Sequence, residues 1–265
     1  MRLTRYLFVG GLHRSGTSLV ARMAARVPGA AGIVGAPVPE NEGVYLQGAI
    51  PHDALAGAPM RFATDPAQHL TEAHPLNRLE TRTRLATDWD PWFPADAAWR
   101  VEKSPVNLTR MRLLQQLFPL AQFVVVIRHP EAVAAAVAKW VDDPASARID
   151  HWLDAHDIVL TDIARLHAVL VLRYEDVVAR PDAVSAALAA FLDRDADRTR
   201  TDEVIRDGNR DYPDAPVMTA AQAARAADWG YAEARGVGEW APILRHPLRS
   251  IREATAAALG GQSSK

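Results

Sequence analysis

The stretch from residue 6 to residue 20, YLFVGGLHRSGTSLV, constrains the fold of this chain more than any other segment. An apolar run leads into a glycine-rich turn, and a helical pattern starts directly after it. Gly11 to Ser18 read G-x-x-x-x-G-T-S, a phosphate-loop pattern with Thr17 in place of the usual lysine. The glycines let backbone N–H groups face an anion, and the helix adds its positive N-terminus. A strand, an anion-binding loop and a helix are favoured over a plain turn.

Further apolar segments predict four more strands, at residues 32–34, 99–102, 122–127 and 168–172. The runs FVVVI and VLVL are continuous, which is typical of parallel strands covered on both faces. Helical patterns lie between the strands: one spans 17–27, one follows Ser104 as an N-cap, and two begin at Pro130 and Pro181. We expect an α/β fold, a doubly wound parallel sheet of about five strands with a P-loop-like phosphate-binding loop.

The length of 265 residues fits a single domain spanning 1–265. Residues 36–98 are rich in Pro, Gly, His and Trp and show no clear strand pattern, so we interpret them as a long excursion from the core. Loops of this kind tend to carry function. The part from 219 to 265 is predicted to be mostly helical.

Composition excludes several classes of site. There are no cysteines, and therefore no disulfides, thiolate metal sites or cysteine nucleophile. The net charge of −2 gives no field that favours nucleic acid or an anionic membrane. No apolar run reaches the ~18 residues of a membrane span. No signal peptide is recognisable, and we expect a cytoplasmic protein. The nine histidines lack HxH or HExxH spacing, so no metal site is expected.

Basic residues follow the predicted strands. In doubly wound sheets, ligands bind beyond the carboxyl ends of the strands. Those ends are followed by Arg14, Lys103, Arg128 and Arg173. A loop that uses Mg²⁺ and ATP also needs an aspartate after a nearby strand. Here FVVVI ends in Arg128, and Asp176 comes late after its strand. The pattern indicates an anion held by arginine and backbone without a metal.

These motifs together resemble the sulfotransferase family that uses 3′-phosphoadenosine 5′-phosphosulfate (PAPS). GLHRSGTS is similar to the 5′-phosphosulfate loop, VVIRHPEAVAAAVAKW to the 3′-phosphate segment, and VLRYED to a strand that contacts the adenosine. EKSP resembles the lysine-bearing turn of bacterial and carbohydrate or tyrosyl-protein sulfotransferases. RGVGEW, shorter than the commonest form, resembles the late loop that covers the nucleotide. All five occur in the family's order.

The resemblance implies a set of PAPS-binding residues. For the 5′-phosphosulfate they are Arg14, Ser15, Gly16, Thr17 and Ser18. For the 3′-phosphate and the adenine side they are Arg128, Tyr174, Arg235 and Gly236. Ala136 departs from the family, many of whose members have a serine there. The 3′-phosphate is therefore expected to depend more on Arg128, Arg235 or Lys139.

The resemblance also implies the catalytic groups. Lys103 is expected to stabilise the charge that builds on the leaving oxygen, with Arg14 assisting. A base from residues 36–98 is expected to take the acceptor's proton. Glu42 is the first candidate, because tyrosyl-protein members place a glutamate in such a stretch. His69 is the second, and Glu40, His52 and Glu72 stay open.

The predicted function is metal-independent, in-line transfer of a sulfuryl group from PAPS to a hydroxyl of a small-molecule, sugar or tyrosyl acceptor by a bacterial type of enzyme. The insertion at 36–98 is expected to select that acceptor. Two alternatives stay open, a divergent P-loop kinase or NTPase and an inactive nucleotide-binding module. A homodimer is compatible with the sequence, which does not fix the oligomeric state. The aromatic residues Trp89, Trp92, Phe93 and Trp99 are interpreted as packing under a loop rather than lining the acceptor site.

Overall fold

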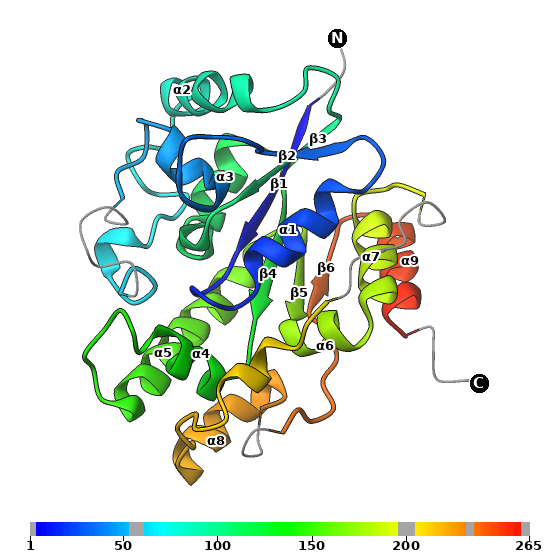
Figure 1. The fold of residues 1–265 in the computed structure, drawn as a ribbon. Helices are drawn as coiled ribbons and strands as arrows, with labels where there is room; N and C mark the ends of the chain where they lie inside the picture. Colours follow the sequence, from blue (N-terminus) through cyan, green and yellow to red (C-terminus); the bar gives the residue numbers. More distant parts are fainter. Residues whose placement is uncertain (1–3, 53–60, 196–204, 232–235, 261–265) are drawn as a thin grey trace.

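A computed structural model describes residues 4–52, 61–195, 205–231 and 236–260 (Figure 1). Its centre is a six-stranded sheet of order β2-β3-β1-β4-β5-β6. The strands are β1 (Arg5–Gly10), β2 (Ala30–Gly32), β3 (Trp99–Lys103), β4 (Gln122–Ile127), β5 (Val169–Arg173) and β6 (Leu244–Arg245). The first five are parallel, and β6 pairs antiparallel with β5. The predicted doubly wound α/β fold is confirmed.

Helices cover both faces of the sheet, which explains why its strands are apolar without alternation. Along β1, Tyr6 and Phe8 belong to one apolar cluster, whereas Leu7 and Val9 belong to the other. The Leu7 face packs against the helices α1 (Thr17–Ala25), α7 (Pro181–Phe191) and α9 (Arg249–Gly260). The Phe8 face packs against α2 (Leu79–Trp89), α3 (Met111–Leu117), α4 (Pro130–Val137) and α5 (Ala145–Ile163). In Figure 1, α1 crosses in front of the sheet, and α7 and α9 lie side by side.

Several predicted boundaries were wrong. β2 lies at Ala30–Gly32 instead of 32–34, and α1 stops two residues before Val27. The segment after Ser104 is a 3₁₀ helix, η5 (Pro105–Thr109), followed by α3, and the Ser104 hydroxyl caps neither of them. That hydroxyl instead donates to Glu102 Oε1. The strand β6 was missed, because two residues carry no readable pattern and their pairing with β5 is long-range.

The segment from 36 to 98 wraps one end of the sheet. Its described residues form α2 and the 3₁₀ turns η1 (Pro39–Asn41), η2 (Gly43–Leu46), η3 (Pro66–Gln68) and η4 (Asp90–Trp92), without a strand. The aromatic cluster is packed, as predicted: Trp89 and Phe93 of this segment and Trp99 at the start of β3 are buried, and Trp92 is half-buried. The indole N–H of Trp89 donates to the Gly43 carbonyl at 2.9 Å. The cluster therefore anchors this segment to the core.

The C-terminal part adds α6 (Tyr174–Ala179) directly after β5, and later α8 (Ala220–Ala226). Across the ranges that the structure describes, none of the helices is both long and apolar enough to cross a membrane.

A neutral histidine lies between α5 and the segment after α8. His156 is fully buried, its ring centroid is 3.8 Å from that of Trp152, and Trp229 packs against its edge. Its Nδ1 lies 2.7 Å from the Trp152 carbonyl, so Nδ1 carries the proton. Nε2 is buried without a partner among the described residues. A second proton on this ring would create an unpaired buried donor.

This environment predicts acid sensitivity. Burial lowers the pKa of His156 from 6.5 to about 4. The unfolded chain binds a proton below 6.5 but the folded chain does not until about 4, so stability falls as pH falls through this window. Between about pH 7 and about pH 5, this residue should lower the free energy of unfolding by about 2 kcal/mol. His156→Phe should remove that loss in urea titrations. An equal loss in both proteins would contradict the assignment.

Candidate functional site

The phosphate loop is shaped by two glycines that no other residue could replace without displacing a neighbour. A Cβ on Gly11 would lie 2.4 Å from the Val126 carbonyl oxygen. Gly16 has φ of 97°, and a Cβ there would lie 2.7 Å from Cδ2 of Tyr174. The helix α1 begins directly after it, at Thr17. The curled backbone and the N-terminus of α1 thus have the arrangement in which we expect an anion to bind.

Within the loop, the predicted ligands differ in their surroundings. Ser15 is fully buried, and its hydroxyl has no hydrogen-bond partner among the described residues. Thr17 is buried, and the Ser18 hydroxyl donates to Glu40 at 3.3 Å. Arg14 is exposed, with its guanidinium 5.8 Å from the Trp140 ring. The unpartnered Ser15 hydroxyl is what a loop built around an absent anion would leave.

Arg128 lies against the loop, as predicted. Its side chain is buried and donates from Nη1 to the Arg14 carbonyl at 2.8 Å and from Nε to Asn209 Oδ1 at 2.7 Å. The guanidinium stacks 4.5 Å from the Tyr174 ring. Nη2 is buried without a partner in the described part of the chain. Arg128 therefore fixes the loop through its backbone and keeps one donor group for an anion.

Tyr174 joins the loop to the segment 205–212. Its hydroxyl accepts from the Gly208 N–H at 2.8 Å and donates to the Arg206 carbonyl at 3.0 Å. Asn209, in the same segment, donates to Glu175 at 2.9 Å. Sequence reasoning missed this segment, because a lone asparagine in a polar stretch carries no signal.

The late loop is anchored by a different arginine. Arg173 binds Asp176 and donates to the Gly238 carbonyl at 2.9 Å, so its charge is used within the fold. Gly236 belongs to this loop, whereas Arg235 lies outside the described residues. Lys139 Nζ lies 4.8 Å from the Trp140 ring, which is also next to Arg14 of the loop.

The two leading catalytic candidates are brought together. Lys103 Nζ lies 2.9 Å from Glu42 Oε1, and the two side chains are only 7% and 10% exposed. In the sheet, Lys103 is paired in register with Val9, close to the start of the phosphate loop. Burial raises the pKa of the Glu42 carboxyl, although Lys103 opposes that shift. The Lys103 amine and the Glu42 carboxyl, whose basicity is increased by burial, thus lie together in a buried position beside the loop.

The end of β3 holds the turn that carries Glu42. Glu102 accepts from the Gly43 N–H at 3.0 Å, and Ser104 accepts from the Val44 N–H at 3.0 Å. The last two residues of β3 and the residue after it therefore meet three successive turn residues. A Cβ on Gly43 would lie 2.6 Å from Glu102 Oε1, so only glycine fits. Sequence reasoning missed Glu102, for which the signal was a charged residue next to the end of an apolar strand.

The other proposed base is elsewhere. His69 Nε2 lies 2.7 Å from Asp162, near the C-terminal end of α5, which leads into the start of β5. His69 is therefore paired with Asp162, whereas Lys103 is paired with Glu42. Of the open candidates, Glu72 pairs with Arg112, and Glu40 lies beside Ser18.

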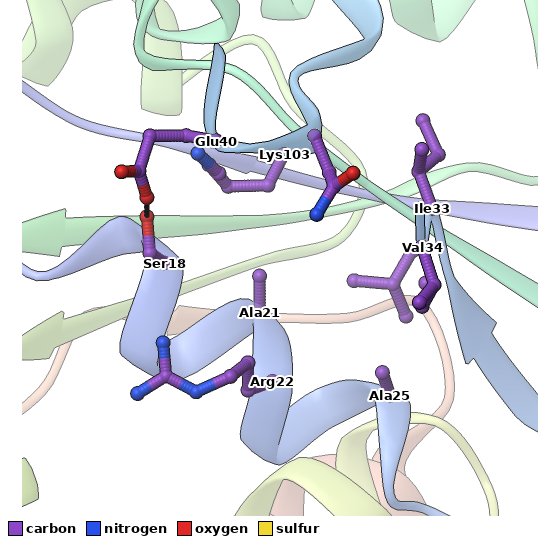
Figure 2. Close-up of a pocket in the computed structure, with 11 residues that line it drawn as sticks. Ser18, Ala21, Arg22, Ala25, Ile33, Val34, Glu40 and Lys103 are labelled. Atoms are coloured by element: carbon purple, nitrogen blue, oxygen red, sulfur yellow. Dashed lines mark hydrogen bonds between the residues drawn. The ribbon is translucent and has the colours of Figure 1, made fainter. Parts of the chain in front are cut away.

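A cavity of about 350 Å³ opens between α1 and the β2–β3 edge. Figure 2 shows Ser18, Glu40 and Lys103 gathered at one end, with Ile33, Val34 and Ala25 at the other. Its lining comprises Ser18, Ala21, Arg22, Ala25, Gly32, Ile33, Val34, Glu40, Asn41, Val101 and Lys103. The cavity therefore borders Lys103, the candidate catalytic lysine.

A histidine of the loop lies on another side of Lys103. Burial, with a smaller contribution from Lys103, lowers the pKa of His13 to about 4. Its ring packs edge-on to Phe62 and Trp140. His13 is therefore neutral at ordinary pH. Considering only the residues that the structure describes, no group of three or more His, Asp or Glu side chains is arranged to hold a metal ion.

Comparisons with known proteins identify the family of the chain. Residues 7–198 match the family model described as "Sulfotransferase family". Among solved structures, sulfotransferase STF9 from Mycobacterium avium has a TM-score of 0.51 at 13% identity, covering 86% of this chain and 76% of that one. The sulfotransferase domain of the Synechococcus PCC 7002 olefin synthase gives 0.47 at 17% identity, covering 100% and 96%. STF1 from Mycobacterium tuberculosis H37Rv gives 0.48 at 16%, covering 79% and 70%. No curated protein sequence matches the chain.

The grip of Glu102 on the turn can be tested by substitution. Glu102→Ala leaves the donors of Gly43, Ser104 and Asn107 without their acceptor. We expect the free energy of unfolding to fall by about 3 kcal/mol, since each unsatisfied buried donor costs roughly 1–3 kcal/mol. The Gly43 amide should also exchange its hydrogen faster. Glu102→Gln is the matched control, because it keeps one oxygen and should cost less than half as much. Unchanged exchange at Gly43 in Glu102→Ala would show that the turn is held by other contacts.

Proposed function

The chain belongs to the sulfotransferase family, and we propose that it transfers the sulfuryl group of PAPS to a hydroxyl group of an acceptor. The observation that carries the proposal is the phosphate loop with two buried polar groups that have no partner among the residues the structure describes, the Ser15 hydroxyl in the loop and Nη2 of Arg128 against it. These groups fit a ligand with separate anionic ends. The cytoplasmic location and the bacterial type of enzyme expected from the sequence are part of the same proposal.

The residues suit such a donor. Ser15, Thr17 and Ser18, with the N–H groups that open α1, would hold the 5′-phosphosulfate, and Arg14 would assist from the loop. Nη2 of Arg128 would meet the 3′-phosphate, with Tyr174 on the adenine side and Gly236 and Arg235 as cover. When bound, PAPS supplies an activated sulfuryl group and leaves as adenosine 3′,5′-bisphosphate.

Lys103 and Glu42 would divide the chemistry. As the bond between sulfur and the acceptor oxygen forms and that to the leaving oxygen breaks, negative charge grows on the leaving oxygen. An ammonium has three N–H bonds, and among the described residues Lys103 donates one of them, to Glu42. The others are available to that oxygen. Glu42, its pKa raised by burial, would take the acceptor's proton.

Nucleotide selectivity tests the donor. Calorimetry without metal should show binding of adenosine 3′,5′-bisphosphate, with adenosine 5′-monophosphate weaker by about tenfold or more, because it lacks the charge-assisted bonds to Arg128. Arg128→Lys should reduce bisphosphate affinity more than monophosphate affinity. This difference separates a contact with the 3′-phosphate from a distorted loop. Tight binding of ATP with Mg²⁺ and no response to the bisphosphate would instead indicate a P-loop kinase or NTPase.

Paired substitutions test the base. With PAPS and a panel of phenols, alcohols and sugars, mass spectrometry should detect a sulfated product. Glu42→Gln should lower kcat by about 10² or more and leave bisphosphate affinity unchanged. Glu72→Gln is the matched control, because the Glu72 carboxylate pairs with Arg112 away from the cavity, and it should retain most of the turnover. The reverse result would move the base to Glu72. Intact PAPS with every acceptor would point to an inactive nucleotide-binding module.

A further inference from the structure

We propose that the cavity between α1 and the β2–β3 edge is the acceptor site, and that it takes an uncharged hydroxyl compound with an apolar body, such as a phenol. The inference rests on the proposed function, because it assigns the second substrate of that reaction.

The position of the cavity, next to the proposed transfer site, is the first reason to assign it to the acceptor. Its polar end is made by Lys103 from the end of β3, Ser18 from the first turn of α1, and Glu40. Two of these three residues also belong to the proposed transfer site. Glu42 lies directly across the Lys103 amine, at 2.9 Å from it. A hydroxyl placed at this end is therefore next to both the proposed base and the cation that meets the leaving oxygen.

The size of the cavity and the side chains of its walls are the second reason for this assignment. Ala21 and Ala25 are four residues apart and line it from one face of α1, opposite Val101, Ile33 and Val34. The packing beneath is tight, since a Cβ on Gly32 would lie 3.3 Å from that of Ala25. The small alanine side chains thus leave a space of about 350 Å³. This volume is at the lower end of the range for small-molecule sites, roughly 300–1,000 Å³.

The chemistry of the lining selects the class of acceptor. The polar end offers hydroxyl, carboxylate and amine groups for one hydroxyl, whereas the outer end is formed by Ala25, Ile33 and Val34. A sugar with one hydroxyl at the polar end would place others against Ala25, Ile33 and Val34, whose side chains offer no partner, and each such hydroxyl costs free energy. Of the charged lining residues, Lys103 is paired with Glu42, and Glu40 and Arg22 carry opposite charges, so the lining gives no net preference for a charged body. An aryl alcohol fits both ends of the cavity, because its single hydroxyl can bond at the polar end and its ring can pack against the apolar end.

A cysteine scan reads binding at the cavity without relying on turnover. The chain contains no cysteine, so Ala21→Cys introduces a single thiol. The rate of its modification by iodoacetamide, followed by mass spectrometry, reports access to the cavity. The matched control is Ala258→Cys, a half-buried alanine on α9, which packs against α7 and β6 away from β2. Ala25→Cys provides a second cavity position should the first variant not fold.

With adenosine 3′,5′-bisphosphate present, 2-naphthol should slow modification at residue 21 by about tenfold at a concentration about ten times its Kd, by mass action. Residue 258 should be unaffected, and methyl glucoside should protect neither position. Equal rates at residues 21 and 25 with and without 2-naphthol would overturn the assignment. Protection of these positions by the bisphosphate alone would also overturn it, because the cavity would then belong to the nucleotide. Failure of the unmodified protein to bind the bisphosphate would count against the proposed function alone.

Discussion

The buried ion pair between Lys103 and Glu42 is the interaction on which the rest of the site depends. Removing two charges from water is costly, and the pair persists only if both groups are held in place. The sheet holds Lys103, and Glu102 and Ser104 hold the turn of Glu42 by its Gly43 and Val44 N–H groups. Trp89 fixes the same turn from the other side. The long segment 36–98 is thus connected to the sheet at the point where the chemistry is proposed.

Arg128 plays a comparable part on the nucleotide side. By binding the Arg14 carbonyl and Asn209, it connects the phosphate loop to the segment 205–212. Tyr174 supports the same junction through Gly16 and Gly208. Residues that the resemblance assigns to the ligand therefore also organise the fold around it. Within the described ranges, this dual use leaves Nη2 as the one group of the Arg128 side chain without a hydrogen-bond partner.

The sequence was most informative where local pattern and fold coincide. Strand β4, the loop from Gly11 to Ser18 and the helix starts at Pro130 and Pro181 were predicted, because apolar runs, glycine spacing and proline act over a few residues. The resemblance singled out Lys103 and Glu42 separately, and only the structure shows that they pair. The roles of Glu102, Asn209 and β6 depend on contacts between distant segments, and no local pattern encodes those. The same holds for His69, whose partner Asp162 lies 93 positions away.

The alternation of side chains along β3 has a consequence for how this protein can vary. Glu102 and Lys103 are neighbours in sequence but project to opposite faces, one gripping the turn and the other entering the cavity. A single inserted or deleted residue within β3 would exchange the two faces, sending the carboxylate into the cavity and the amine into the core. The loops around the site can therefore change in length, whereas the strand β3 cannot gain or lose a residue without losing the arrangement of Glu102 and Lys103.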